Sequence, residues 1–435
     1  MNDFAIHSNR VMVDGEMIDA TVIVKNGRIE DVIKGKIDIA EWTTIEVGNK
    51  VLMPGVTDPH VHINEPGRTE WEGFETATKA AIAGGITTLV DMPLNSSPVT
   101  TTVKALQEKQ LAAQNKMHCN VLFWGGIVPG NTNEIEGLIK SGVKGFKAFL
   151  THSGIDDFPN VTEADLRLAM PIIAKHGLPL LVHAELTTSP ANNVVTDVRS
   201  YKQYVASRPK KWEDDAIEMM IKLCEEYNCR VHIVHLSSAN SIPQIATAKA
   251  KGLPLTVETA QHYLYFNAEE IADGNTAFKC APPIREKANN DLLWQGLKDG
   301  VIDFVATDHS PATPDLKEME SGNFTKAWGG IASIQFALPI LWTAAKQRGF
   351  ALADVVKWLC QNPTLLAGTA AHKGKIAKGY DADFIVFDDS QSFTVTKQII
   401  EHKHKITPYL GEELLGVVEQ TYIAGERVFL REESI

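Results

Sequence analysis

GVTDPHVHI, residues 55–63, is an apolar run that carries two histidines, His60 and His62, one residue apart. Side chains in a β-strand alternate between two faces, so positions i and i+2 point the same way. Both imidazoles can therefore reach one object, and a metal ion is the object that suits a pair of histidines. Taken alone, this pattern is equally compatible with two unrelated histidines. Other ligands in the chain must decide between these interpretations.

Similar apolar runs recur along the chain, separated by stretches rich in Ala, Leu, Glu and Lys that suit helices. After residues 55–63 they are GITTLVDMP (85–93), CNVLFWGG (119–126), GVKGFKAFL (142–150), LPLLVHAE (178–185), CRVHIVHLSS (229–238), LPLTVETA (253–260) and IDFVATDHS (302–310). Eight such strands alternating with helices predict an α/β protein with a (β/α)8 TIM barrel. An open doubly wound sheet is disfavoured because no glycine-rich phosphate turn follows the first run.

The two ends of the chain have a different pattern. ATVIVKNGRIEDVIKG (20–35) alternates apolar and polar residues around an NG turn, which predicts a hairpin, and residues 374–388 and 419–430 repeat this style. Neither end is long enough to bury a core alone. We therefore predict one small β-sandwich domain from residues 1–52 and 373–435, beside a barrel formed by residues 53–372.

Composition narrows the class of partner. The net charge of -12 disfavours nucleic acids and anionic membranes as partners, because both need a basic face, so we expect a small-molecule substrate. No apolar run reaches the length of about 18 residues that is needed to span a bilayer. The first residues also lack the charged start and apolar stretch of a signal peptide, so we expect a cytoplasmic protein. Five cysteines at irregular spacings indicate reduced thiols.

Ionisable residues gather where the predicted strands end, which is where barrels build their chemistry. They are His60, His62, Lys147, His183, His235 and Asp308. Burying them together without a metal would leave charge and unsatisfied donors in the interior. His232 and Lys144 lie three positions before His235 and Lys147, so they face the opposite side and are less suitable ligands. An ammonium group has no lone pair, so Lys147 suits a metal only after modification, such as carbamylation by CO2.

These segments resemble the amidohydrolase superfamily, specifically its cyclic amidases. The resemblance covers nearly the whole chain and is carried by residues 58–95, GVKGFKAFL, LLVHAE, VHLSS and ATDHSP. It implies a binuclear site in which His60, His62 and Asp308 hold one metal, His183 and His235 hold the other, and carbamylated Lys147 bridges them. It also implies a homotetramer. Zinc suits these nitrogen and oxygen ligands, although cobalt, manganese, nickel and iron fit the same set.

The resemblance further implies hydrolysis of a cyclic amide. Two cations sharing a water lower its pKa to about 7 and polarise the amide carbonyl. Asp308 can then accept the proton of the water and deliver it to the departing ring nitrogen, which leaves poorly without protonation.

Differences from relatives bear on the substrate. Dihydroorotases, which bind a carboxylate, typically have an arginine and a histidine where this chain has Asn64 and Ala312, so we expect an uncharged ring. HINEPGR (62–68) and KAWGGIAS (326–333) resemble enzymes that open allantoin, a purine breakdown product with a hydantoin ring and a ureido arm. Hydantoinases of the dihydropyrimidinase type and dihydroorotases are the alternatives. Candidate substrate-binding residues are Asn64, Asn95, His262 and Cys280; Asn95 is equally compatible with a turn before Pro98.

A non-enzymatic protein of the same superfamily is the alternative from another functional class. Some superfamily members are metal-free scaffold or assembly proteins that have lost their ligands and bind partners instead. This chain keeps all six ligand positions, which disfavours a scaffold. Metal content of the purified protein distinguishes the two.

Overall fold

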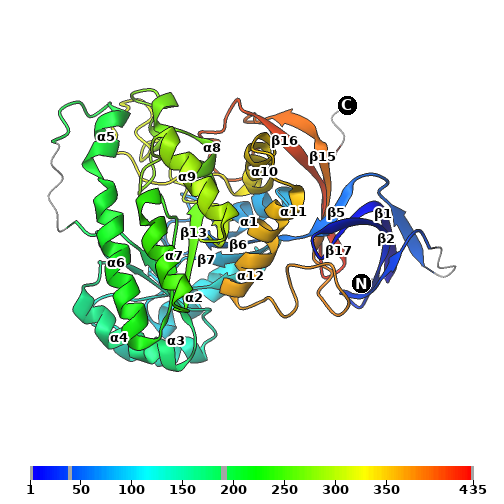
Figure 1. Cartoon of the computed structure of the whole chain (residues 1–435), viewed down its shortest axis with the longest axis horizontal. Helices are drawn as coiled ribbons and strands as arrows, with labels where there is room; N and C mark the ends of the chain where they lie inside the picture. The colour runs from blue at the N-terminus through cyan, green and yellow to red at the C-terminus, as the bar shows by residue number, and fades with distance from the viewer. Residues whose placement is uncertain (1–2, 38–41, 188–193, 433–435) are drawn as a thin grey trace.

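The computed structural model describes residues 3–37, 42–187 and 194–432. It contains a barrel surrounded by helices and, beside it, a sheet built from both ends of the chain (Figure 1). The predicted barrel is confirmed, because each of the eight apolar runs contains one of its parallel strands. The strands are β6 (Val56–Val61), β7 (Ile86–Asp91), β8 (Asn120–Phe123) with β9 (Gly125–Gly126), β10 (Phe146–Phe149), β11 (Pro179–His183), β12 (Arg230–Ile233), β13 (Leu255–Ala260) and β14 (Phe304–Ala306).

Strands β8 and β9 are two pieces of one barrel strand, interrupted at Trp124. The amide of Lys144 donates to the Phe123 carbonyl at 3.0 Å, and the amide of Gly125 donates to the Gly145 carbonyl at 2.9 Å. Both pieces therefore lie beside the segment that leads into β10.

The first and last strands close the ring. The Thr307 hydroxyl, just after β14, donates to the Asp58 carboxylate in β6 at 2.5 Å. Further along, the amide of His62 donates to the His309 carbonyl at 2.8 Å. Closure thus occurs beside the predicted metal ligands.

Helices cover the outside of the barrel (Figure 1). In chain order they are α1 (Phe74–Ala83), α2 (Val103–Ala113), α3 (Ile135–Lys140), α4 (Glu163–Lys175), α5 (Tyr201–Ser207), α6 (Lys210–Tyr227), α7 (Ile242–Ala250), α8 (Gln261–Tyr265), α9 (Lys287–Lys298), α10 (Ala337–Gln347), α11 (Leu352–Val356) and α12 (Asn362–Ala367). Most are amphipathic, so their apolar faces complete the core around the strands. In α6, for example, Trp212, Ile217, Met220 and Leu223 are buried.

The two ends of the chain share one mixed sheet. Its strands are β1 (Phe4–Val13), β2 (Glu16–Lys25), β3 (Arg28–Lys34), β4 (Thr43–Glu46), β5 (Val51–Pro54), β15 (Phe384–Thr394), β16 (Glu413–Ile423) and β17 (Glu426–Leu430). The pairing path runs β17-β16-β15-β5-β1-β2-β3, with β4 beside β1. Asn26 and Gly27 form the predicted hairpin turn between β2 and β3, both with positive φ.

This sheet curls around a core of its own. The rings of Phe4 and Tyr422, from opposite ends of the chain, lie 5.8 Å apart, and Val22, Ile29 and Phe384 belong to the same buried cluster. The two halves therefore face each other, as in a sandwich, although their strand pairing is continuous. Strand β5 spans the predicted domain limit at residues 52/53, and the exact limits of both domains stay predictions.

Helix α10 packs between the barrel and the sheet (Figure 1). Its residues from Ala337 to Ala345 are all buried. Barrel residues such as Ile86 belong to the same apolar cluster as Phe387 and Val418 of the sheet. The barrel and the sheet consequently share one continuous core.

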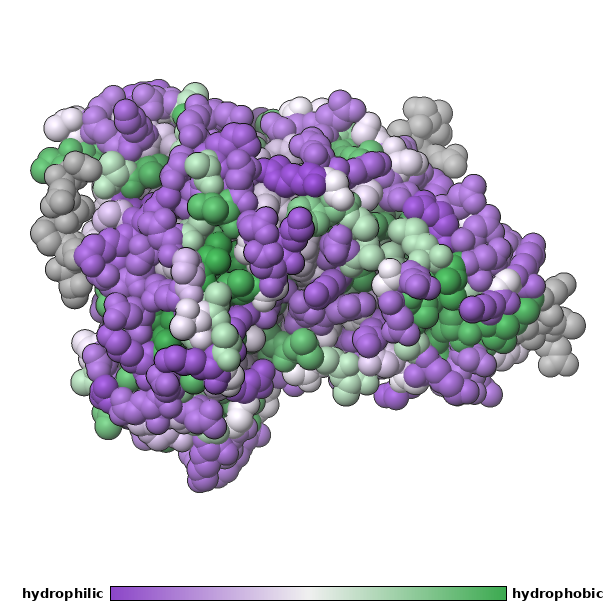
Figure 2. Space-filling model, viewed as in Figure 1, coloured by the Kyte–Doolittle hydropathy of each residue, from purple (hydrophilic) through white to green (hydrophobic). Residues whose placement is uncertain are grey.

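The outer surface is mostly polar. On the face shown in Figure 2, hydrophilic residues predominate, and hydrophobic residues gather in narrow bands and over the terminal strands. Within the described ranges, no helix has both the length and the apolar character needed to cross a membrane. All five cysteines are buried and unbridged, as predicted.

Candidate metal centre and active site

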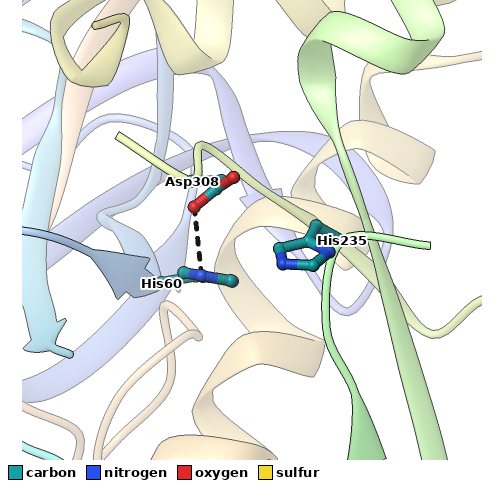
Figure 3. Close-up of side chains that lie close together, drawn as sticks. All are labelled: His60, His235 and Asp308. Atoms are coloured by element: carbon teal, nitrogen blue, oxygen red, sulfur yellow. Dashed lines mark ion pairs between the residues drawn. The ribbon is translucent and has the colours of Figure 1, made fainter. Parts of the chain in front are cut away.

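Three predicted ligands converge at the mouth of the barrel (Figure 3). His60 lies at the end of β6, His235 follows β12 and Asp308 follows β14, and one donor atom of each lies within 4.8 Å of the others. The Asp308 carboxylate is 3.1 Å from His60 Nε2 and 3.5 Å from His62 Nε2. Donors from three separate strands thus surround one point.

The remaining predicted ligands lie around this group. The imidazoles of His183 and His235 are 4.7 Å apart, measured between ring centroids. Phe149 stacks on His183 at 4.5 Å, and Lys147 Nζ lies 5.0 Å from the centre of the Phe149 ring. All six predicted ligands are buried. The structure therefore brings the whole predicted set to one end of the barrel.

Two atoms of this set indicate that it fits a metal. Lys147 Nζ and His235 Nδ1 are both buried and have no hydrogen-bond partner among the described residues. A buried polar group without a partner costs free energy, so both atoms suit a ligand from outside the chain. Imidazole nitrogens with carboxylate oxygens are the donors that zinc and similar divalent cations prefer.

The pKa values of the histidines also suit metal binding. Burial lowers the pKa of His62 to about 4 and that of His235 well below its ordinary range, so both stay neutral and keep a lone pair. For His60, burial lowers the pKa, but Glu258 and Asp308 outweigh it and raise the value to about 9. The carboxylates of Glu258 and Asp308 thus favour a positive charge at the His60 ring. A bound metal cation can supply that charge in place of the proton on the imidazole.

Asp308 remains a carboxylate. Burial raises its pKa, but His60 and His62 overcome that effect and hold the pKa well below its usual range. The backbone of both His235 and Asp308 is in the left-handed region, with φ of 37° and 47°. Non-glycine residues in this region carry strain and concentrate at functional sites.

Glu258, on β13, orients His60. Its carboxylate contacts His60 Nδ1, accepts from the amide of His235 at 3.4 Å and lies 3.1 Å from Nε2 of His232. A carboxylate at Nδ1 keeps the proton there and leaves Nε2 free for a metal. His232 is also bonded to Thr256, so Glu258 and Thr256 occupy both of its ring nitrogens. Sequence reasoning missed Glu258, although an acidic residue within an apolar strand was a signal that could have found it.

The other histidines have partners too. Glu185 lies 2.7 Å from His183 Nε2 and is in turn paired with Arg208. The Asn95 side chain lies 3.1 Å from His62 Nδ1. Glu185 and Arg208 were not predicted from the sequence, and Asn95 contacts a ligand as well as lining the cavity.

A cavity of about 570 Å³ opens onto the ligands. Its wall includes Asn95, whereas Asn64, His262 and Cys280 are buried and are not among the lining residues. Their roles in substrate binding stay predictions. Wall residues that the sequence did not indicate include Thr151, Ser153, Arg208, Lys279, Ser310 and Phe324. Most of them come from long loops, where no local pattern marks a cavity, whereas Arg208 lies in the short link between α5 and α6.

Arg285 has a structural role. It is buried and bonded to Glu213 at 2.7 Å and to the Ser237 hydroxyl at 3.0 Å. It therefore fixes the loop after β12, which carries His235.

The barrel, the curled terminal sheet and the ligand set together are those of a metal-dependent hydrolase. The pattern of the Amidohydrolase family matches residues 51–428, and the chain belongs to this family.

Individual relatives are more specific. An allantoinase of Streptomyces avermitilis is 47% identical over 430 residues, covering 98% of this chain and 95% of the relative. Allantoinases of Saccharomyces cerevisiae and Arabidopsis thaliana are 42% and 44% identical, covering 99% and 98% of this chain and 96% and 87% of the relatives. Among solved structures, L-hydantoinase (dihydropyrimidinase) from Arthrobacter aurescens has a TM-score of 0.93 at 29% identity, covering 100% of this chain and 98% of that one.

Proposed function

We propose that this protein is an allantoinase, which hydrolyses the ring amide of allantoin to allantoate. The observation that carries the proposal is the convergence of His60, His235 and Asp308 at a cavity in a chain 42–47% identical to allantoinases of three organisms. The likeness to hydantoinase structures supports a related ring as the alternative substrate.

We propose two divalent cations, most simply zinc, as cofactors. His60, His62 and Asp308 would hold one and His183 and His235 the other, with Lys147 as an N6-carboxylysine between them. Such cations supply a water acidic enough to attack at neutral pH and polarise the amide carbonyl. The unpartnered Lys147 Nζ and His235 Nδ1 support this assignment.

Asp308 is the proposed catalytic residue. Its carboxylate is ionised and faces the cavity, so it can take the proton of the attacking water. It then protonates the ring nitrogen as the C–N bond breaks. His60 and His62, both within 3.5 Å of the carboxylate, hold it in place for this transfer.

Two positions that differ from dihydroorotases support an uncharged substrate. Arg208 is balanced by Glu185, and Asn64 and Ala312 replace the carboxylate-binding residues of dihydroorotases. Burial and Arg208 lower the pKa of Lys279 to about 8, so this wall residue is still mostly charged at pH 7. A positive wall suits the carboxylate that hydrolysis creates, but it would suit an anionic substrate equally. The argument for an uncharged ring therefore rests on Asn64 and Ala312.

The test compares kcat/KM for allantoin, dihydroorotate, hydantoin and dihydrouracil, using enzyme reconstituted with zinc and bicarbonate. We expect allantoin to exceed the others by at least ~100-fold. Dominance of dihydroorotate would refute the argument from charge, and dominance of hydantoin or dihydrouracil would favour the alternative. A preparation that binds less than about one equivalent of metal and hydrolyses none of them would indicate a scaffold.

The family resemblance also supports a homotetramer and a cytoplasmic role in using purine breakdown products as nitrogen sources. We propose both on that basis.

A further inference from the structure

Two loops distant in sequence form the outer wall of the cavity. One comprises residues 279–281, and the other comprises residues 324–330 in the long connection after β14; we call them the wall loops. Lys279 and Ala281 of the first loop and Phe324 to Gly329 of the second line the cavity. Neither loop contains a strand or helix, so side-chain contacts must fix their positions.

Lys317 joins these loops. Its side chain is buried, with 4% exposed, although lysine is almost never buried without a partner. Its ammonium donates to the Lys279 carbonyl at 3.1 Å, to the Trp328 carbonyl at 3.1 Å and to the Gly330 carbonyl at 2.7 Å. All three N–H donors are thus used, and they connect one wall loop to the other.

Further contacts extend the junction. Lys279 Nζ donates across the gap to the Ala327 carbonyl at 2.5 Å, and the Trp328 amide donates to the Leu316 carbonyl at 2.7 Å. At Gly330 the backbone approaches Ser310 so closely that a Cβ would collide with its carbonyl. The second loop therefore packs against the segment that follows Asp308.

The result is a fixed position for Trp328. Its indole N–H donates to the Ser310 carbonyl at 3.3 Å, and its ring meets that of Trp71 edge to face at 4.7 Å. Removing the Lys317 ammonium would leave three carbonyls without this donor, the Gly330 carbonyl buried and those of Lys279 and Trp328 partly buried. Restoring their hydrogen bonds requires the loops to separate.

We propose that Lys317 is a positioning residue that clamps the two wall loops together and so sets the shape of the substrate cavity. Its three hydrogen bonds go to backbone carbonyls, and none of them goes to a predicted metal ligand. The clamp should therefore govern substrate binding more than chemistry. The identity of the substrate in this cavity rests on the proposed function, but the role of Lys317 in holding the wall loops together does not.

The experiment compares wild type with Lys317→Met, with Lys317→Gln and with Lys249→Met. Lys249→Met is the matched control, because it removes a partly buried ammonium bonded to Asp303 at 2.6 Å, outside the cavity wall. Hydrogen exchange, metal content, KM and kcat are measured for each. Exchange reports the opening of each loop directly, with no substrate present.

In Lys317→Met we expect amide exchange in residues 279–281 and 313–330 to accelerate about ten-fold or more, while residues around His60 and His235 stay unchanged. KM for allantoin should rise about ten-fold, while kcat should stay within about three-fold of the wild-type value. The reason is that substrate must then order the loosened loops when it binds, which weakens binding. Metal content should not change. Lys317→Gln, which keeps two N–H donors, should be intermediate and serves if the Met variant does not fold.

Unchanged exchange and unchanged KM in both Lys317 variants would overturn the proposal. Exchange that accelerates throughout the barrel would also overturn it, by showing that Lys317 serves global stability alone. If the acceleration is confined to the wall loops but wild type does not hydrolyse allantoin, the proposed function fails and the clamp stands.

Discussion

Asp308 combines two roles in one side chain. Its carboxylate contacts two histidines of the ligand set and also borders the cavity. Replacing it with asparagine keeps the shape and one oxygen donor but removes the group that carries the proton. Binding of metal and turnover should therefore separate in this variant.

We expect Asp308→Asn to lower kcat by roughly 10²–10⁴-fold, the range for loss of a general acid or base. Metal content, measured by atomic emission, should fall much less. Asp315→Asn, the same change at an exposed position of the same loop, is the control and should retain wild-type kcat. Near-normal turnover in Asp308→Asn would show that another group moves the proton.

The pKa of Lys147 lies near neutral pH. Burial lowers its pKa to about 7, although Glu258 and Asp308 act in the opposite direction. Below pH 7 the side chain is an ammonium, which cannot add CO2; above pH 7 it is a neutral amine, which can. The lowered pKa therefore favours carbamylation on the alkaline side.

We expect metal-stripped protein supplied with zinc to regain activity faster at pH 8 than at pH 6, at a fixed concentration of dissolved CO2. The rate should rise around pH 7, where the amine loses its proton. Recovery of activity is followed over time at each pH. A rate that does not change with pH, or that does not depend on CO2, would contradict the role of Lys147.

The sequence indicated the ligands but not their partners. His60, His183 and Asp308 were predictable because a barrel places strand ends together. Glu258 and Glu185 lie in the same runs, but a lone acidic residue does not reveal which ring nitrogen it faces. Lys317 was beyond reach, because its acceptors are backbone carbonyls of distant loops.

Among the elements, α2 and β7 are joined by a buried ion pair. Lys109 of α2 is 2.5 Å from the Asp91 carboxylate at the end of β7, and both are almost fully buried. Asp91 also accepts from the amide of Ile63 at 2.8 Å, next to His62. The pair therefore holds the helix, the strand and the ligand-bearing segment together.

We expect Lys109→Met to lower the free energy of unfolding by about 3–5 kcal/mol, because Asp91 is left buried without its partner. Lys104→Met, on the same helix but exposed, should change it by less than about 1 kcal/mol. Urea denaturation measures both. The double variant Lys109→Met with Asp91→Asn should recover part of the lost free energy of unfolding. If Lys109→Met and Lys104→Met lower the free energy of unfolding equally, the argument is refuted.

Element prediction succeeded where periodicity was strong. All eight apolar runs became barrel strands, and the Asn26–Gly27 turn became a hairpin. The interruption at Trp124 had no signal in the sequence, since it depends on how Lys144 and Gly145 pair across the barrel. The continuous pairing of the terminal sheet likewise arises from contacts between ends of the chain that local patterns do not encode.

At the scale of the whole molecule, the barrel and the terminal sheet share a core. Helix α10 lies between them, and Gly416 of β16 is so close to Phe387 that a Cβ would collide with its ring. Unfolding of one unit would expose apolar surface of the other. The two units should therefore be coupled energetically.

We expect calorimetry to show one unfolding transition, coincident with loss of tryptophan fluorescence and of far-ultraviolet circular dichroism. Gly416→Val, placed in the sheet, should lower the midpoint of the whole transition, since φ of 99° and the Phe387 ring both oppose a side chain. Two separate transitions, or a change confined to one of them, would show that the units unfold independently.

Closure of the ring by Asp58 and Thr307, 249 positions apart, also sets an order of events during synthesis. A ribosome adding about 5–20 residues per second needs roughly 10–50 s between these two residues. The histidines after Asp58 emerge long before the carboxylate that completes their site. A nascent chain is thus unable to assemble its metal centre until the last barrel strand has left the exit tunnel.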